Sequence, residues 1–428
     1  MKIFSTKEKG FIKNLEAIVR RGETDTSGIE EAVRTIINDV RQHGDRSVFK
    51  YTEKFDGIRL SKQDVQCGKS DIEKAFKKIP RHDLKILQLA AKRIFAFHKR
   101  QIGKSWAFAE KDGTILGQLV TPLERVGIYV PGGKAAYPST VLMNAIPAVV
   151  AGVKQIIMVT PPGRNGINPY VLAAARIAGV DKIYRIGGAQ AIAALAYGTE
   201  TIPKVDKIVG PGNIYVATAK RLVFGAVDID MIAGPSEILI LNDGAGNPSW
   251  IAADLLSQAE HDELASSILL TTSKKMADDV AKEVARQIKE LRNRQRIAQA
   301  SIDRYGAIII TENLTEAAAL ANKIAPEHLE LFTAKPFKLL KKIKNAGAIF
   351  LGHNTPEALG DYMAGPNHTL PTGTTARFSS PLGVEDFIKR SSVISFSKKG
   401  LKKLDKAVVR FAEIEGLEAH GKSVERRM

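Results

Sequence analysis

The chain has 428 residues, of which 44% are hydrophobic and 6% aromatic, and its formal net charge at pH 7 is +17. That length and hydrophobic content are sufficient for large buried cores and indicate two or three domains. The single cysteine, Cys67, excludes a disulfide within the chain and a metal cluster held by thiolates, and it suits the reducing cytosol.

The amino-terminal segment, residues 1–14, mixes lysines with isolated apolar residues. Because it lacks a long apolar core, we do not expect it to be a secretory signal. No run of about 18 apolar residues occurs in the sequence, so we expect no segment that spans a membrane.

Residues 28–100 are expected to be mainly helical. Apolar residues recur there at helical spacing, which predicts helices with one buried face. The two apolar stripes are Ile29, Val33, Ile36, Ile37 and Val40, and then Leu84, Leu87, Ala91 and Ile94.

From about residue 124, strands and helices are expected to alternate, which predicts βα units and a parallel sheet. Short apolar runs that end in glycine or proline mark strands at 126–130, 155–160, 182–186 and 205–209. The helices between them are expected at 138–152, 168–179, 189–198 and 214–225.

The alternation restarts after Gly234-Pro235 and predicts a second domain of the same kind. Its strands are expected at 237–242, 267–272, 307–311, 329–333 and 348–351, with helices at 248–260 and 274–298. After Phe396 an apolar stripe predicts a final helix, whereas the tail beyond Gly416 is too polar for a core of its own. We expect that tail to dock elsewhere, for instance on a second subunit. The expected fold class is therefore α/β, with two doubly wound, Rossmann-like domains that meet near residue 235.

The high positive charge leaves two interpretations open. One is a nucleic-acid-binding module, but the lysine pairs are spread along expected helices, without zinc-finger spacing or an aromatic–basic RNA signature. The other is attraction of an anionic cofactor such as a dinucleotide.

Three glycine-rich loops follow expected strands of the first domain, at 130–134, 186–190 and 210–213. Each precedes an expected helix, so free backbone N–H groups could face phosphates. None is a complete G-x-G-x-x-G fingerprint, and each could simply end a strand and let a helix pack closely. The three together favour a nucleotide site.

Imidazole, carboxylate and amide groups gather in the C-terminal part of the chain. Gln258 and His261 lie three apart near the end of an expected helix, so both could reach one ion, although His261 could also be a helix cap. Asp361 follows the last expected strand of the second domain and is either a site residue or a solvated turn residue. Such a set suits a borderline metal with acid–base chemistry.

Glu327 and His328 stand at the start of the strand expected at 329–333. Neighbouring side chains in an extended segment point to opposite sides, so we expect the two residues to act separately and not as one dyad. The alternative is that the glutamate is a surface carboxylate beside a strand. The remaining histidines are expected in turns or supporting roles (His353, His368) and on the surfaces of charged helices (His43, His82, His98).

Five motifs resemble the L-histidinol dehydrogenase family over nearly the whole chain. They are DIDMIAGPSE at 228–237, SQAEH at 257–261, APEHL at 325–329, GDYMAGPNH at 360–368 and EGLEAH at 415–420. The resemblance implies oxidation of L-histidinol to L-histidine in two NAD-dependent steps through L-histidinaldehyde, the last steps of histidine biosynthesis, in a cytoplasmic homodimer.

The resemblance also implies site residues. One zinc ion per subunit would be held by Gln258, His261, Asp361 and His420, the last from the other subunit. Ser236, His328 and Glu415 would bind substrate together with the metal ligands, and NAD would contact Tyr129, Gln190 and Asn213.

The implied fold is of the aldehyde-dehydrogenase type. Residues 1–106 would be a helical segment packed on the core, 107–235 the NAD-side domain, 236–380 the metal-side domain and 381–428 a tail exchanged between subunits.

The chemistry of this assignment is coherent. His328 can accept the hydroxyl proton, because imidazole titrates near neutral pH, and Glu327 can activate water for the second oxidation. Cys67 is far from every motif, so we expect no thioester intermediate.

Two departures from the family affect loops only. His261 precedes Asp262-Glu263 instead of the commoner Gly-Pro, and Thr374 replaces a more usual glycine. A metal hydrolase that uses no nucleotide shares the expected ligand set and remains the alternative enzyme class.

Overall fold

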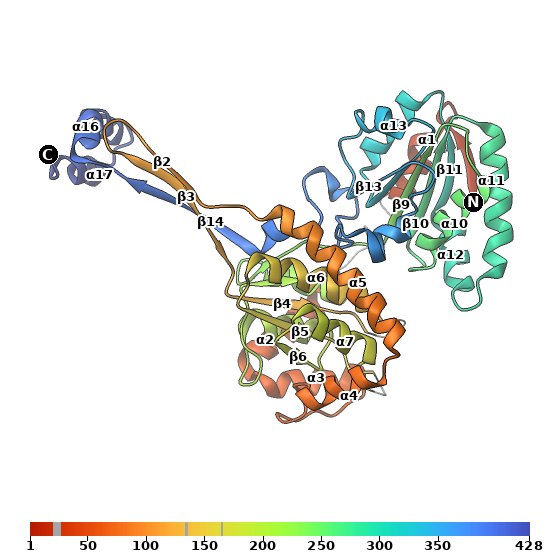
Figure 1. Ribbon diagram of the computed structural model, residues 1–428, viewed down its shortest axis with the longest axis horizontal. Coiled ribbons are helices and arrows are strands. Elements are labelled where there is room, and N and C mark those ends of the chain that lie inside the picture. The colour runs from red at the N-terminus through yellow and green to blue at the C-terminus, as the bar shows by residue number, and fades with distance from the viewer. Residues whose placement is uncertain (20–26, 133–135, 164–165) are drawn as a thin grey trace. The chain divides into compact units, whose positions relative to one another are not determined.

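The computed structural model describes residues 1–19, 27–132, 136–163 and 166–428. Gly133 and Lys134 of the first glycine-rich loop lie outside the described residues. The chain folds into two compact units, one of Met1–Gln101 with Leu123–Phe387 and one of Ile102–Pro122 with Ile388–Met428. Many of their helices and strands are labelled in Figure 1.

The first sheet of the larger unit is parallel and has the order β6-β5-β4-β7-β8. In chain order this is 3-2-1-4-5, the arrangement of a doubly wound fold, which confirms the expected class. The strands are β4 (Arg125–Tyr129), β5 (Gln155–Val159), β6 (Lys182–Tyr184), β7 (Lys207–Val209) and β8 (Asp228–Ile229).

Helices cover both faces of this sheet because side chains alternate along its strands. Ile157 and Val159 pack with α2 (Ser27–His43), α3 (Asp45–Asp56), α8 (Gly188–Tyr197) and α9 (Ile214–Val223). Ile156 and Met158 pack with α4 (Lys69–Lys78), α5 (Arg81–His98), α6 (Pro138–Ala151) and α7 (Pro169–Ala178). These strands are therefore apolar on both sides, as their sequences predict.

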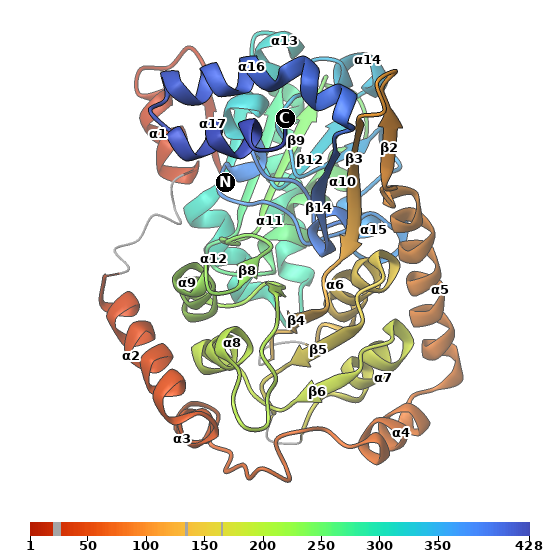
Figure 2. The ribbon, with the colours of Figure 1, turned by 90° about the vertical axis from the view of Figure 1, so that its left-hand side faces the viewer.

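The second sheet repeats the same order and adds one strand at its edge, giving β1-β11-β10-β9-β12-β13. Figure 2 shows β9 and β12 in this sheet, where the two strands are hydrogen-bonded neighbours. The strands are β1 (Lys2–Ser5), β9 (Glu237–Asn242), β10 (Ser266–Thr271), β11 (Gly306–Ile310), β12 (His328–Phe332) and β13 (Ala348–Leu351).

This sheet is also covered on both faces. Leu239 and Leu241 pack with α1 (Phe11–Val19), α13 (Leu314–Ile324) and α14 (Pro336–Leu340). Ile238 and Ile240 pack with α10 (Pro248–Ala259), α11 (Lys274–Gln287) and α12 (Gln295–Tyr305). Two sheets with one winding order confirm the expectation of paired Rossmann-like folds.

The smaller unit is an antiparallel sheet with two helices. Its strands are β2 (Trp106–Ala109), β3 (Ile115–Pro122) and β14 (Ile388–Ser395), in the order β14-β3-β2. The helix α16 (Lys398–Ile414) packs against α17 (Glu418–Glu425), and Lys403 forms an ion pair with Asp112 at 2.8 Å. The final helix that was expected after Phe396 is therefore present.

Some elements differ from the sequence-based expectation. Residues 2–5 form a strand of the second sheet, because Phe4 and the following helix α1 bury apolar side chains there. The helix expected at 274–298 is two helices, since the polar run 292–294 between them has nothing apolar to bury. Residues 115–122 pair with β14 far along the chain, which no local pattern can reveal. The domain boundaries near residues 106, 235 and 380 stay predictions.

His98 was expected on the surface, and that expectation is wrong. Its side chain is fully buried at the end of α5, where Nδ1 lies 2.7 Å from Oε1 of Gln101. No helix among the described residues combines the length and the apolarity needed to cross a membrane.

Candidate active site

Three groups able to bind a metal or a proton converge at one point in the larger unit. His328 Nε2 lies 3.8 Å from Glu357 Oε1 and 3.8 Å from Asp361 Oδ1. His328 begins β12, Glu357 begins the short helix α15 (Glu357–Leu359), and Asp361 lies in the π-helical turn Gly360–Ala364. Their ligand atoms all lie within 4.8 Å of one another, which makes the group a candidate metal site.

The His328 ring has a defined orientation. Its Nδ1 lies 3.0 Å from the main-chain oxygen of Glu237. Because a carbonyl oxygen can only accept, Nδ1 carries the proton in the neutral ring and donates it to Glu237. Nε2 then carries the lone pair, and this buried atom finds no hydrogen-bond partner among the described residues. A buried lone pair beside two carboxylates suits a cation or the proton of a hydroxyl group.

Glu327 and Glu237 hold each other through their main-chain amides. Glu237 N donates to Glu327 Oε2 at 2.9 Å, and Glu327 N donates to Glu237 Oε2 at 3.2 Å. Gly373 N donates to the other oxygen of Glu237 at 3.1 Å. Both carboxylates are buried, so the alternative of a surface carboxylate at Glu327 is wrong.

Glu327 and His328 are closer to each other than the strand geometry predicted. Oε2 of Glu327 lies 3.7 Å from Nδ1 of His328. The alternation of side chains along a strand does not separate them, because Glu327 precedes β12. The two residues are therefore electrostatically linked, although only His328 reaches the Asp361 carboxylate.

Burial and charge shift the pKa values of this cluster. Burial raises the pKa of Glu327 to about 8 and that of Glu357 to about 7. Burial opposes the charged form of His328, but the carboxylates of Glu327, Asp361 and Glu357 outweigh it and raise the pKa of that imidazole to about 10. Burial opposes the charged form of Asp361, but the nearby imidazoles of His328 and His368 outweigh it and lower the pKa of that carboxyl. The site therefore favours positive charge next to Asp361.

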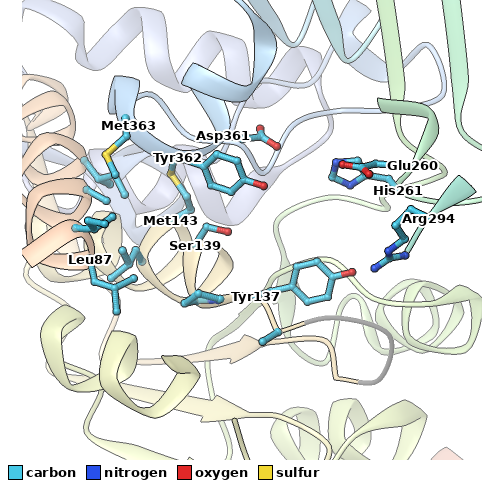
Figure 3. A pocket seen from close by; sticks show the side chains of 16 residues that line it. Leu87, Tyr137, Ser139, Met143, Glu260, His261, Arg294, Asp361, Tyr362 and Met363 are labelled. Atoms are coloured by element: carbon cyan, nitrogen blue, oxygen red, sulfur yellow. The ribbon is translucent and has the colours of Figure 1, made fainter. Parts of the chain in front are cut away.

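A cavity of about 610 Å³ borders Asp361, a volume suited to a small ligand. Figure 3 shows the Asp361 carboxylate and the His261 imidazole on different elements around it. Aliphatic side chains of α5 and α6 form the apolar part of the lining, and polar groups form the rest: Tyr137, Ser139, Glu260, His261, Arg294, Asp361 and Tyr362.

Gln258 and His261 are positioned by the end of α10. The helix ends at Ala259, and His261 N donates to Gln258 O at 3.2 Å, so the turn continues to the histidine. Gln258 is buried, and its Oε1 finds no hydrogen-bond partner among the described residues. His261 is exposed on the cavity wall. Partial desolvation lowers its pKa while the Asp361 carboxylate acts in the opposite direction, so the two groups affect each other.

The other expected substrate residues lie in different places. Ser236 is half-buried directly before β9 and next to Glu237. Glu415, at the end of α16, and His420, in α17, are exposed and belong to the smaller unit. They belong to a different unit from the cluster, and the roles of Glu415 and His420 stay predictions.

The three residues expected at the dinucleotide lie at or just after the carboxyl ends of strands in the first sheet. Tyr129 ends β4, is buried, and accepts a hydrogen bond at its hydroxyl from Gly188 N at 3.2 Å. Gln190 is buried in the first turn of α8, and its Oε1 finds no partner within the described residues. Asn213 is exposed and caps α9, accepting at Oδ1 from two main-chain N–H groups at 3.1 Å.

Sequence reasoning missed Glu357 and Glu237, whereas it expected His368 in a turn or a supporting role. Glu357 lies one helical turn before Asp361, a spacing that could have revealed it. His368 Nδ1 lies 3.9 Å from Asp361 Oδ1, in the motif that contains both. Glu237 ends the motif at 228–237, but nothing in the sequence signals its contact with Glu327.

Cys67 takes no part in this cluster. It is 5% exposed in the apolar core of the first sheet, and burial raises the pKa of its thiol. A thiol kept protonated in this way is a poor nucleophile, which supports the expectation that no thioester forms.

The two parallel sheets and the buried imidazole–carboxylate cluster define an α/β enzyme with the aldehyde dehydrogenase type of fold. An acetylating aldehyde dehydrogenase from Geobacillus thermoglucosidasius has a similar fold, with a TM-score of 0.50 and 14% identity over 91% of this chain and 96% of that one. The crystal structure of histidinol dehydrogenase from Elizabethkingia anophelis is much more similar, with a TM-score of 0.93 and 36% identity over 100% of this chain and 98% of that one.

Sequence comparison identifies the family. The family model for histidinol dehydrogenase matches residues 19–428. Histidinol dehydrogenase of Syntrophotalea carbinolica is 58% identical over 100% of this chain and 99% of its own length. That of Geobacter sulfurreducens is 57% identical over the full length of both chains. The chain therefore belongs to the histidinol dehydrogenase family of oxidoreductases, which confirms the resemblance seen in its motifs.

Proposed function

We propose that the chain oxidises L-histidinol to L-histidine by way of L-histidinaldehyde, with two molecules of NAD reduced per substrate, at the end of histidine biosynthesis. Family membership supports the overall reaction. The observation that carries the proposal is the buried Nε2 of His328, which faces Glu357 and Asp361, because Asp361 also borders a cavity for a small ligand.

The residues present fit a divalent cation. Oε1 of Gln258 is a buried electron-pair donor without a hydrogen-bond partner in the described part of the chain, and the Asp361 carboxylate stays ionised. Nitrogen and oxygen donors suit zinc, although manganese or cobalt would also be accepted. We infer that Gln258, His261 and Asp361, with His420 of a second copy, hold one zinc ion per subunit. Zinc held there would supply a Lewis acid for the imidazole and the amine of the substrate.

His328 acts on the substrate hydroxyl in the first oxidation. Its Nδ1–H is engaged by the main-chain oxygen of Glu237, so only Nε2 is free to accept a proton. That nitrogen lies on the side of Asp361, which also lines the cavity. Positive charge bound at Asp361 would offset the carboxylates that raise the pKa of His328, and would make the imidazole a better base near neutral pH.

Glu327 serves the second oxidation, in which water must add to the aldehyde. Its carboxylate is buried and held by Glu237 N, and a carboxyl whose pKa burial raises to about 8 is matched to proton transfer near neutral pH. Ser236 and Glu415 are assigned to holding the substrate.

Tyr129, Gln190 and Asn213 are assigned to NAD. NAD held there would supply the hydride acceptor for both oxidations. In this chain β4 and β7 are neighbouring strands where the winding of the first sheet reverses, and the space beyond their carboxyl ends is the usual place for a dinucleotide. The N-terminus of α9 beyond Asn213 offers backbone N–H groups to a phosphate.

The test is the stoichiometry of the purified protein. We expect two NADH per histidinol consumed, histidine as the product, loss of activity on chelation and recovery with zinc. One NADH per histidinol, or full activity after complete metal removal, would contradict the proposal. A hydrolase without nucleotide would produce no NADH at all.

We also infer a homodimer that shares each active site between subunits, in the cytosol. The first inference is supported by the assignment of Glu415 and His420, which lie outside the larger unit. The cytosolic location is supported by the single, buried cysteine, which suits a reducing compartment.

A further inference from the structure

A buried ion pair, Lys220–Asp230, lies beneath the loop at residues 210–213 and has no part in the roles assigned so far. The side chains of Lys220 and Asp230 are 2% and 1% exposed, and their charged groups are in direct contact. Lys220 lies in α9, and Asp230 follows β8 inside the motif at 228–237.

Both members of this pair form hydrogen bonds with the main chain of Gly210. Lys220 Nζ donates to Gly210 O at 2.9 Å, and Gly210 N donates to Asp230 Oδ2 at 2.8 Å. The N–H and the C=O of one glycine are thus held by opposite charges. Such charge-assisted hydrogen bonds are stronger than neutral ones.

Gly210 in turn contacts Tyr129, the last residue of β4. Its φ is +108°, a conformation that favours glycine, and a Cβ atom there would lie 2.2 Å from the main-chain oxygen of Tyr129. The Tyr129 hydroxyl accepts a hydrogen bond from Gly188 N, at the start of α8. The ion pair therefore fixes a glycine that packs against Tyr129, one of the residues assigned to NAD.

Stability alone does not explain a pair of this kind. The free energy needed to remove two charges from water offsets much of the free energy gained from their attraction. Apolar side chains therefore often replace such pairs without loss of stability. The pair instead fixes the orientation of the Gly210 main chain beside a proposed ligand site.

We propose that Lys220 and Asp230 are positioning residues for NAD, which hold the Gly210 turn in the conformation that receives the dinucleotide. This inference rests on the assignment of NAD to these loops. Neither side chain needs to touch the cofactor, since both act through Gly210.

The experiment compares Asp230→Asn and the double variant Lys220→Met/Asp230→Asn with the wild type. Asp230→Asn keeps the shape of the side chain and removes its charge, and the double variant leaves no buried charge without a partner. Asp228→Asn is the matched control, because Asp228 lies two residues earlier in the same motif and pairs with Lys207 at 2.9 Å instead.

We expect both Asp230 variants to raise the Kd for NADH and the KM for NAD by about tenfold, the effect of one charge-assisted hydrogen bond. The KM for histidinol and the kcat at saturating NAD should change by less than about threefold, which a general loss of structure would not produce. NADH binding is measured directly by fluorescence, and folding by thermal unfolding of the same samples.

The outcomes separate the two proposals. If the wild type binds no NADH, the assignment of NAD to these loops fails, and the positioning role fails with it. If the wild type binds NADH and the folded double variant binds it equally well, only the positioning role is wrong. An equal effect of Asp228→Asn would also overturn it.

Discussion

The chemistry of His328 is determined by one backbone atom. The main-chain oxygen of Glu237 accepts from Nδ1, so the neutral ring presents its lone pair at Nε2. The same residue, Glu237, receives Glu327 N on its carboxylate and gives its own N–H to the carboxylate of Glu327. One buried residue of β9 thereby orients both of the proposed catalytic side chains.

His328→Asn tests the role of the imidazole as a base. The asparagine amide can still donate to Glu237 O, but it offers no basic nitrogen toward Asp361. We expect the rate of histidinol oxidation to fall by about 10²–10⁴-fold, the contribution of general base catalysis. Steady-state kinetics with His43→Asn, an exposed histidine, as the control provides the measurement. Normal turnover of the His328 variant would show that another group takes the proton.

Glu327→Gln tests the division of labour between the two oxidations. The glutamine oxygen can keep the hydrogen bond from Glu237 N while the basic carboxylate is lost. We therefore expect the oxidation of L-histidinaldehyde to slow by at least about tenfold more than the oxidation of L-histidinol to the aldehyde. Rates are measured with each compound supplied separately. Equal losses in both steps would mean that Glu327 serves the site as a whole.

At the scale of elements, the two sheets present different ends of their strands. The proposed NAD residues follow the carboxyl ends of β4, β6 and β7, as is usual for doubly wound sheets. Glu237 and His328, however, are the first residues of β9 and β12. His328 is paired with Ala348, the first residue of β13, so the segment after β13 must return to that end to bring Asp361 within 3.8 Å. Asp361 is therefore not at a strand-end loop of the expected kind.

The helix α5 contributes to the cavity through Ile86, Leu87, Ala90 and Ile94, and a buried histidine anchors its end. His98 contacts Gln101, whose side-chain oxygen also accepts from Val384 N at 3.1 Å. Burial lowers the pKa of His98, with the hydrogen bond to Gln101 acting in the opposite direction. The folded protein therefore favours the neutral form of the His98 ring.

The protein should lose stability in mild acid through His98. The unfolded chain binds the proton more tightly than the folded one, so this contribution is complete above the unfolded pKa of about 6.5 and is lost as the pH falls below it. Urea unfolding at pH 7.5 and 5.5 should show a smaller decrease for His98→Gln than for the wild type. His82→Gln, an exposed histidine of the same helix, is the control and should behave like the wild type.

At the scale of the whole molecule, local sequence patterns predicted the features that depend on residues close together in the sequence. The βα alternation gave both parallel sheets, and the spacing of Gln258 and His261 matched a real turn at the end of α10. Contacts between distant segments could not be predicted in this way. The pairing of β14 with β3, the strand β1 at the edge of the second sheet and the contact of Glu237 with Glu327 all join segments that are far apart in sequence.

The division of the chain into two units has a consequence for the assembly. Asp361 and His328 belong to the larger unit, whereas His420 belongs to the smaller one. If His420 completes the site of the other subunit, a dimer of one His328→Asn chain and one His420→Ala chain has one site with both changes and one site with neither.

Mixing these two inactive variants should therefore restore activity. Each mixed dimer should have about half the wild-type activity, and a random mixture, half of which is mixed dimers, about a quarter of it. Two different affinity tags allow the mixed dimers to be purified before the assay. The control mixes His328→Asn with Asp361→Ala, two changes in the same unit, which leaves every site with one defect and should restore nothing. Failure of the first mixture to recover activity, with mixed dimers present, would mean that His420 serves the site of its own chain.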